Sequence, residues 1–308
     1  MVPSDSVVEV FKSKPVPPWA PKKFSYKPSA ERSWDLIHTR LDVAFDWEKQ
    51  QMPATAFLSL SPFFYPQDKL VLDAKGFEIR TVTATKKGKP VEIKHFYQGK
   101  KLAIWFTQTQ LKGELVVVKI EYTAKPNELP EGGSVAITKD KGLFFINADG
   151  KDPLLPKQIW TQGEPQSASC WFPTIDNPNE RCTQEMNITV EDRYKTLSNG
   201  TLLYSRKEGK GMRTDVWEMK LPHAPYLFMM AVGDYSVVDD AAGSIPLHYW
   251  VEPKYQPVAK KIFGRTPAMI SYFSRKLGYN FPWPKYDQIV VREFVSGAME
   301  NTSASVFM

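Results

Sequence analysis

The sequence predicts a mainly β protein that ends in a short section of mixed α and β structure. Aromatic residues make up 13% of the 308 residues and there are 25 prolines, a composition that favours short strands and tight connections over long helices. Apolar and polar residues alternate in many segments, which is typical of strands with one buried face. A helical periodicity begins only after Pro253. Together these observations predict antiparallel sheets first and helices late in the chain.

The N-terminal thirty residues are rich in proline and lysine. Proline favours extended backbone at its own position and at the residue before it. We therefore expect residues 1–30 to form an extended arm that is ordered only where it packs on the rest of the protein.

A series of short strands is expected next. Gly88 lies between the segments 77–82 and 91–94, and Gly99 lies between 91–94 and 118–122. A hairpin turn at these places needs the positive φ that glycine tolerates. Residues 151–178 differ, because they contain five prolines and no periodicity, which predicts an irregular loop that is either functional or packed. The segments with strand-like patterns are 33–46, 54–60, 77–82, 91–94, 118–122, 143–147, 184–190, 216–221, 227–232 and 245–251.

Two helices and one further strand are expected after residue 253. The first helix covers 256–263, and the second begins with Thr266 as its N-cap. Gly278 ends the second helix, and a strand over 286–291 follows it. The second helix carries apolar residues at a spacing of three and four, which predicts a face packed in the core: Met269, Ile270, Phe273 and Leu277.

These patterns divide the chain into two parts. A β domain is expected over 1–252, and the start of a second domain over 253–308. The second part has only about 56 residues, which is near the lower limit for independent folding. The chain also ends on apolar residues, Val306 to Met308, whereas a natural terminus is more often polar. We therefore expect the second domain to be incomplete and the chain to be truncated.

Composition excludes several classes of function. The net charge of +6 is spread along the chain, without the concentrated basic stripe that nucleic-acid binding requires. The longest apolar run, 226–232, is far shorter than the roughly 20 residues of a membrane helix. Residues 1–28 contain no apolar signal segment. The compartment stays open between the cytoplasm and a secreted or periplasmic location with the signal removed.

Cysteine and histidine are scarce. Cys170 and Cys182 are too few for a disulfide scaffold, and both a pair in an oxidising compartment and two buried thiols remain open. No two histidines have the close spacing of a local zinc motif. The four histidines are His38, His95, His223 and His248.

The most informative segment is Gly297-Ala298-Met299-Glu300-Asn301. Small residues at Gly297 and Ala298 allow another backbone to approach closely, so that an extended peptide could be added as a strand. Glu300 would then place a carboxylate beside that peptide, and a carboxylate forms a strong hydrogen bond with an ammonium group. Taken alone, five such residues more often form an ordinary loop with a surface glutamate.

This segment resembles the Gly-Ala-Met-Glu-Asn motif of the aminopeptidase N-like zinc metallopeptidases, the gluzincin aminopeptidases. A second segment, Thr161-Gln162-Gly163-Glu164-Pro165 with the following 171–178, is similar to the part of that family at the rim of its site. The order and spacing of the two segments also fit, and the similarity extends from about residue 33 to the end. The resemblance implies a saddle-shaped, antiparallel, β-sandwich-like N-terminal domain followed by the start of an α+β thermolysin-like domain.

The resemblance also implies roles for particular residues. Glu300 and Glu164 would both bind the free α-amino group of a peptide substrate. Gly297 and Ala298 would hold the peptide backbone, together with Met299 and Asn301 of the same motif. Gln162 and Ser296 would line the pocket for the first side chain. A peptide without a free N-terminus would leave both carboxylates unpaired, which explains exopeptidase selectivity.

The zinc ligands and the general base of the family lie in a His-Glu-x-x-His helix and a later glutamate, and this chain contains neither. The resemblance therefore implies a zinc aminopeptidase whose catalytic groups lie downstream, with the remainder of the peptidase domain as a partner. We expect no catalytic residue and no zinc in the chain itself. The alternative is a non-catalytic relative that uses the β domain as a binding or scaffold module.

Two positions depart from the family pattern. Ser169 stands where many relatives have arginine, and Asn177 where many have glutamate. These differences concern the packing of the local loop, in which we expect Asp176 to cap backbone groups. At Glu164 and Ala298 the sequence agrees with the plain aminopeptidases rather than with the leukotriene-hydrolase branch, which typically has glutamine and glycine there.

Overall fold

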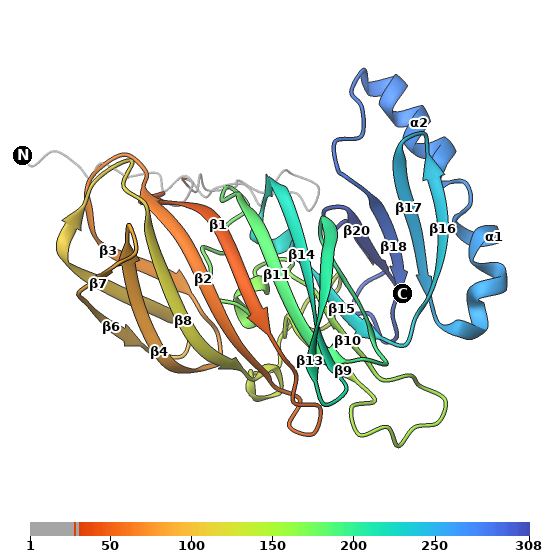
Figure 1. The fold of residues 1–308 in the computed structure, drawn as a ribbon, viewed down its shortest axis with the longest axis horizontal. Helices are drawn as coiled ribbons and strands as arrows, with labels where there is room; N and C mark the ends of the chain where they lie inside the picture. The colour runs from red at the N-terminus through yellow and green to blue at the C-terminus, as the bar shows by residue number, and fades with distance from the viewer. Residues whose placement is uncertain (1–27, 29–30) are drawn as a thin grey trace, which may run out of the picture. The chain divides into compact units, whose positions relative to one another are not determined.

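A computed structural model describes residue 28 and residues 31–308 of the chain. The described part is mainly β, as the sequence predicts, with strands in four sheets (Figure 1). The arm expected for residues 1–30 lies outside the described residues, apart from Pro28. No helix of the described part is long and apolar enough to cross a membrane.

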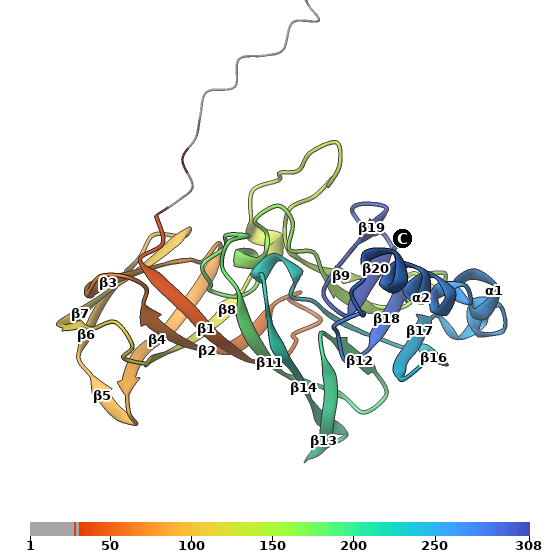
Figure 2. The ribbon, with the colours of Figure 1, turned by 90° about the horizontal axis from the view of Figure 1, so that it is seen from above.

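The largest sheet has eight strands. All neighbouring strands are antiparallel except β1 and β11, which run parallel with His38 opposite Thr183. Figure 2 shows β1, β2 and β8 side by side within this sheet. In spatial order the strands are β13 (Thr201–Gly209), β14 (Met212–His223), β11 (Cys182–Glu191), β1 (Trp34–Val43), β2 (Met52–Pro62), β8 (Val116–Ala124), β4 (Phe77–Lys86) and β5 (Lys89–Val91).

Two smaller antiparallel sheets accompany it. A three-stranded sheet has the order β3 (Gln67–Asp73), β7 (Lys101–Gln110) and β6 (Ile93–Tyr97). A four-stranded sheet has the order β12 (Lys195–Ser198), β15 (Met230–Gly233), β10 (Gln158–Thr161) and β9 (Leu143–Ile146). The expectation that 151–178 is irregular throughout is wrong at β10. All four residues of β10 are buried, so this strand lacks the alternation by which a half-exposed strand is detected.

The last sheet is mixed and has five strands. It pairs β17 with β18 and β18 with β20 in parallel, whereas β16–β17 and β19–β20 are antiparallel. The sheet therefore contains residues from both sides of position 253. In spatial order its strands are β16 (Ser236–Ala242), β17 (Ile245–Val251), β18 (Tyr286–Val290), β20 (Ala304–Phe307) and β19 (Ala298–Met299).

The helices α1 (Ala259–Phe263) and α2 (Thr266–Leu277) connect β17 to β18 (Figure 1). Gly278 ends α2 with a φ of 64° and donates its N–H to the carbonyl of Arg275, as predicted. The predicted N-cap is wrong, because Arg265 occupies that position and Thr266 is the first helical residue. The Thr266 hydroxyl donates instead to Gln288 Oε1 at 2.6 Å, so it joins α2 to β18.

The apolar face of α2 is exposed in the described part of the chain, which contradicts the expected core packing. Met269, Phe273 and Leu277 are 52%, 57% and 73% exposed. The periodicity correctly identifies an apolar face, but it contains no information about which segment covers that face.

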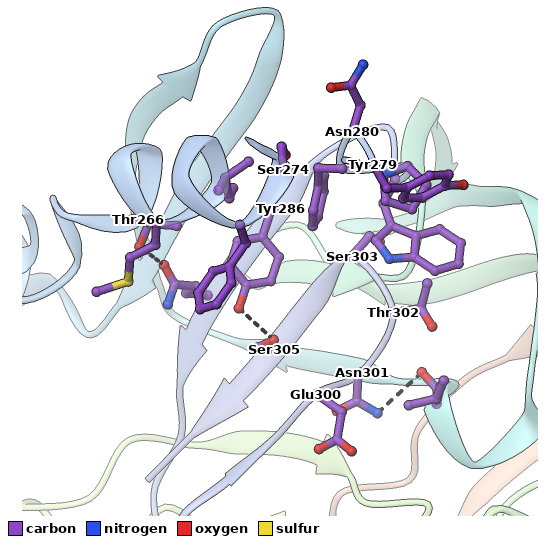
Figure 3. Close-up of a pocket in the computed structure, with 18 of the residues that line it drawn as sticks. Thr266, Ser274, Tyr279, Asn280, Tyr286, Glu300, Asn301, Thr302, Ser303 and Ser305 are labelled. Carbon is purple, nitrogen blue, oxygen red and sulfur yellow. Dashed lines mark hydrogen bonds between the residues drawn. The ribbon is translucent and has the colours of Figure 1, made fainter. Parts of the chain in front are cut away.

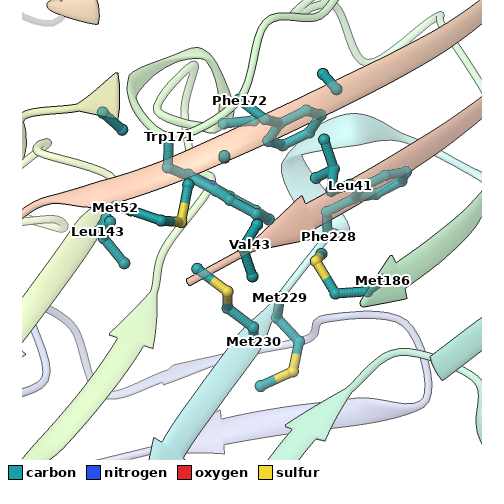
Figure 4. Packing of buried hydrophobic residues seen from close by; sticks show 14 of the residues in the cluster. Leu41, Val43, Met52, Leu143, Trp171, Phe172, Met186, Phe228, Met229 and Met230 are labelled. Atoms are coloured by element: carbon teal, nitrogen blue, oxygen red, sulfur yellow. The ribbon is translucent and has the colours of Figure 1, made fainter. Parts of the chain in front are cut away.

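The core lies mainly between the sheets of the β part and is rich in aromatic side chains and methionine (Figure 4). Trp171 and Phe172 are fully buried, and the ring of Phe172 stacks on Phe228 at 5.2 Å. Both residues belong to the loop before β11 that the sequence marks as irregular. Aromatic rings of this size bury a large apolar area, so the loop is a structural part of the core.

Candidate peptide-binding site

The motif Gly297 to Asn301 forms β19 and the turn after it, at the edge of the five-stranded sheet. Gly297 accepts a hydrogen bond from the N–H of Met308, and Ala298 lies opposite Phe307 in β20. The backbone groups of an antiparallel strand point alternately toward and away from the partner strand. The N–H and C=O of Ala298 therefore face the open edge, where an extended peptide could pair with them.

The side chains of the motif point to different surroundings. Glu300, Gly297 and Ala298 are exposed and Ser296 is half-buried, whereas Met299 is 1% exposed and packs in the core. A Cβ atom added at Gly297 would meet nothing within 4 Å. Packing within the described residues therefore does not require glycine there, which leaves the space in front of it open to a ligand.

Asn301 anchors the turn that carries Glu300. Its side chain is buried, and its amide donates to the carbonyl of Leu227 at 3.3 Å (Figure 3). The carboxylate of Glu300 lies next to this buried anchor and stays accessible. The motif thus combines a fixed residue with an accessible negative charge.

A pocket of about 530 Å³ lies between this turn and α2 (Figure 3). Its lining is mainly apolar and aromatic, and it includes Glu300 at one end. Among the lining residues the sequence predicts a role only for Glu300 and Asn301; the three aromatic residues within 279–283 were the signal that could have indicated the others. The aromatic members of the lining are Tyr226, Phe273, Tyr279, Phe281, Trp283 and Tyr286.

The second predicted segment follows β10 directly. Thr161 and Gln162 are buried, and Glu164 is half-buried. A Cβ atom added at Gly163 would lie 2.2 Å from the carbonyl oxygen of Tyr226, so the backbones of these two segments are in direct contact. Glycine at position 163 is therefore required by packing.

The segment 226–228 brings the two predicted parts of the site together. Gly163 packs on the carbonyl of Tyr226, and Asn301 donates to the carbonyl of Leu227. Glu164 directly follows Gly163 in the sequence, and Glu300 directly precedes Asn301. Both glutamates therefore neighbour a residue that contacts segment 226–228, a connection that the sequence alone does not indicate.

Polar atoms of Gln162 lack partners within the described residues. Both its Nε2 and its Oε1 are buried without a hydrogen bond, and an unpaired buried amide is costly. The same is true of Oδ1 of Asn301. These atoms lie in the two predicted segments, where a ligand or an ordered water could satisfy them.

The loop after Glu164 is fixed by Asp176, as the sequence predicts. Its Oδ2 accepts from the backbone N–H of Ser169 at 3.0 Å and from the Ser169 hydroxyl at 2.7 Å. Burial raises the pKa of Asp176. The serine that departs from the family pattern is therefore part of the loop's own hydrogen bonding.

Within the described residues no group of three or more His, Cys, Asp and Glu side chains could hold a metal ion. Cys170 and Cys182 are free and buried, and burial raises the pKa of each thiol to about 12. His223 is also buried, stacks on Phe228, and has its pKa lowered by burial to about 3. Burial keeps both thiols protonated and makes all three side chains inaccessible, so none of them has the exposure of a nucleophile or an open metal ligand.

An open strand edge, an accessible carboxylate and an adjoining aromatic pocket thus lie together on a mainly β scaffold. Comparison with known families makes this more specific. Residues 35–227 match the peptidase M1 N-terminal domain, and residues 262–308 match the peptidase family M1 domain. The chain therefore belongs to the peptidase M1 family, in agreement with the resemblance that its motifs indicate.

Several curated relatives are aminopeptidases. Glutamyl aminopeptidase of Bos taurus is 31% identical over 203 residues, which cover 62% of this chain and 21% of that protein. Endoplasmic reticulum aminopeptidase 1 of Mus musculus is 21% identical over 281 residues, which cover 88% of this chain and 28% of that protein. The chain thus spans between about a fifth and little more than a quarter of the length of these relatives.

Gly163→Ala is expected to lower the free energy of unfolding by about 1–3 kcal/mol, the usual range for overpacking. The added methyl group would lie 2.2 Å from a backbone oxygen, so the contact between 163 and 226 must open. Urea denaturation of both proteins measures the change. Gly297→Ala is the matched control, because nothing lies within 4 Å of the added atom. Equal stability of the two variants would contradict the contact between 163 and 226.

Proposed function

We propose that this chain is the N-terminal portion of a zinc-dependent aminopeptidase and that it supplies the groups that bind the N-terminus of a peptide substrate. The observation that carries the proposal is the position of the Gly297–Asn301 motif. It forms an open sheet edge with Glu300 accessible, and its turn rests on the same segment, 226–228, as the Gln162–Glu164 segment. Family membership supports the same conclusion.

In this proposal Glu300 and Glu164 bind the substrate ammonium group from two sides. The backbone of Ala298 pairs with the first residues of the peptide, and Gly297 leaves room for them. Met299 and Asn301 contribute through the strand and the buried anchor. Two carboxylates around one ammonium select peptides with a free N-terminus, because an acylated peptide leaves both charges without a partner.

Gln162 and Ser296 are proposed to line the pocket for the first side chain. Gln162 brings a buried amide with no partner among the described residues, and Ser296 is half-buried beside the motif. A site that hydrogen-bonds a substrate group discriminates more strongly than an apolar pocket of the same size.

Zinc would polarise the scissile carbonyl and activate water in such an enzyme. The described residues do not fit this role, since they contain no suitable group of metal ligands. We therefore propose that the zinc ligands belong to residues outside this chain.

The rest of the peptidase domain is proposed as the partner of α2. Met269, Phe273 and Leu277 form an exposed apolar face that lines the aromatic pocket, and contiguous exposed apolar surface of this kind marks an interaction site. The relatives are several times longer than this chain, so residues that could cover this face exist in proteins of this family.

The 308-residue chain alone is expected to bind no stoichiometric zinc and to hydrolyse no aminoacyl-anilide substrate. The reason is that the described residues offer no metal-ligand group. Elemental analysis of the purified chain and an anilide assay measure the two properties. A longer protein that includes the rest of the peptidase domain serves as the positive control, and its activity is expected to be lost on chelation. Activity that survives chelation would contradict the zinc proposal, and no activity at all would favour the scaffold alternative.

A further inference from the structure

The end of β12 and the turn to β13 contact the C-terminal part of the chain through three consecutive residues. The carbonyl of Ser198 accepts from Lys285 Nζ at 3.1 Å. The side chain of Asn199 donates to the carbonyl of Thr302 at 2.7 Å, and the N–H of Gly200 donates to the Ser303 hydroxyl at 2.8 Å. Two of these contacts reach the turn that follows Glu300. The proposed function assigns no role to this hydrogen-bonded turn.

Asn199 connects three segments at once. Its Nδ2 donates to the carbonyl of Leu227 at 2.9 Å as well as to Thr302, and its Oδ1 accepts from the N–H of Met229 at 2.8 Å. The residue is 1% exposed, and its side chain uses both amide hydrogens and one oxygen lone pair. A buried amide bonded in this way fixes its partners, since breaking any one bond leaves a buried polar group unpaired.

The carbonyl of Leu227 is shared between two asparagines. It accepts from Asn199 at 2.9 Å and from Asn301 at 3.3 Å. Asn199 therefore contacts the turn after Glu300 directly, through its hydrogen bond to Thr302. It also contacts this turn indirectly, because it shares the carbonyl of Leu227 with Asn301. The segment that contains Leu227 is the same one on which Gly163 packs.

Both residues of the hydrogen bond between Gly200 and Ser303 have a positive φ. Gly200 has a φ of 74°, and a Cβ atom there would lie 1.8 Å from the carbonyl oxygen of Glu218. Ser303 has a φ of 64°, a left-handed conformation that a residue with a side chain adopts at a cost. The chain therefore holds Ser303 in a costly conformation while its hydroxyl accepts from Gly200.

We propose that Asn199 is a positioning residue for recognition of the substrate N-terminus. It fixes the turn after Glu300 against segment 226–228, and thereby sets the position of Glu300 relative to Glu164. This inference rests on the proposed function, because it assumes that the two glutamates bind one ammonium group. Two carboxylates can share an ammonium only if their separation is held closely, and the short strand β19 alone would allow the turn to move.

The test compares binding of two peptides to the 308-residue chain. The probes are trialanine amide and N-acetyl-trialanine amide, and NMR titration measures both dissociation constants. The wild-type chain is expected to prefer the free amine by about tenfold, which corresponds to about 1.4 kcal/mol. In Asn199→Ala this preference is expected to fall to about twofold. The affinity for the acetylated peptide is expected to stay the same, which a general loss of structure would not produce.

A second variant keeps the test informative if Asn199→Ala folds poorly. Ser303→Gly removes the acceptor of the Gly200 N–H, but glycine tolerates the φ of 64°. We expect the preference of this variant for the free amine to fall by about threefold from the wild-type value, and its stability to stay nearly that of the wild type. Asn147→Ala is the matched control, since Asn147 also donates to two backbone carbonyls and accepts one N–H, within its own loop. It should keep the tenfold preference.

The outcomes separate the two proposals. If the wild-type chain shows no preference for the free amine, the proposed function is wrong and this inference is wrong with it. If the wild type has the preference and both Asn199→Ala and Ser303→Gly retain it, the anchoring function stands and the positioning role of Asn199 is overturned.

Discussion

Glu300→Ala is expected to lower kcat/KM for aminoacyl-anilide hydrolysis by about ten- to a hundredfold in a protein that includes the rest of the peptidase domain. The variant removes one charged hydrogen bond to the substrate ammonium, which is worth about 1.5–3 kcal/mol. Glu300 is exposed on the turn after β19, so the loss should appear in substrate recognition with little change in stability. Initial rates over a range of substrate concentrations measure it.

Glu164→Ala is expected to cause a loss of similar size, and the double variant should lose less than the product of the two single effects. The reason is that both carboxylates bind the same group, and residues that act as a unit are not additive. Glu300→Gln separates charge from hydrogen bonding, since it keeps an acceptor of the same shape. Glu78→Ala is the matched control, because Glu78 is an exposed carboxylate on β4 with a lysine partner.

Retention of wild-type kcat/KM by both single variants would show that neither glutamate anchors the substrate. A loss in Glu300→Ala alone would retain the motif as an anchor and remove Glu164 from the site. A loss that is equally large in Glu78→Ala would indicate a general effect of charge.

The strands are the part of the fold that the sequence predicts best. In β8 and β11 every second side chain is buried, and β1 follows the same alternation on either side of a register shift between Leu36 and His38. The pattern of apolar residues therefore reflects the fold directly in these strands. Prediction fails where both faces are covered, as in β10, or where a face is uncovered, as in α2. In both cases tertiary surroundings, rather than local pattern, decide which residues are buried.

The candidate site shows the same division. The local order of residues is sufficient to find the motif around Glu300 and the segment around Glu164. The parts that connect them are not local: the bond from Asn199 to Thr302 spans 103 positions in the sequence, and an asparagine in a turn is ordinarily explained by the turn itself. Contacts of this kind follow from the pairing of whole sheets, which a single sequence does not contain.

A second set of buried polar residues escaped the sequence analysis and joins the five-stranded sheet to the four-stranded sheet. Lys285 and Asp287 are 3% and 1% exposed, and Lys285 Nζ lies 2.6 Å from Asp287 Oδ2. The same ammonium donates to the carbonyl of Ser198, at the end of β12. Asp287 also accepts from His248 Nδ1 at 2.6 Å, and this hydrogen bond raises the pKa of His248.

Burial lowers the pKa of Lys285, and the carboxylate of Asp287 opposes that shift. The carboxylate of Asp287 therefore stabilises the charged form of this buried lysine. Removing one partner of a buried pair is more damaging than replacing both, since the remaining charge has no counterion. Asp287 has a second hydrogen-bonding partner in His248, whereas no described carboxylate other than Asp287 is paired with Lys285.

Asp287→Asn is expected to lower the free energy of unfolding by about 3–5 kcal/mol. Lys285→Met should cost less, because the aspartate keeps His248 and methionine packs well in a buried site. The double variant should lose less than the sum of the single losses, since it leaves no unpaired lysine. Urea denaturation at neutral pH measures all three.

Asp192→Asn is the matched control, because it breaks an ion pair of similar length, 2.8 Å, in which the lysine, Lys207, is 76% exposed. Its expected cost is at most about 1 kcal/mol. If Asp287→Asn costs no more than Asp192→Asn, the Lys285 charge is not buried in the way described, and the pair does not hold the two sheets together.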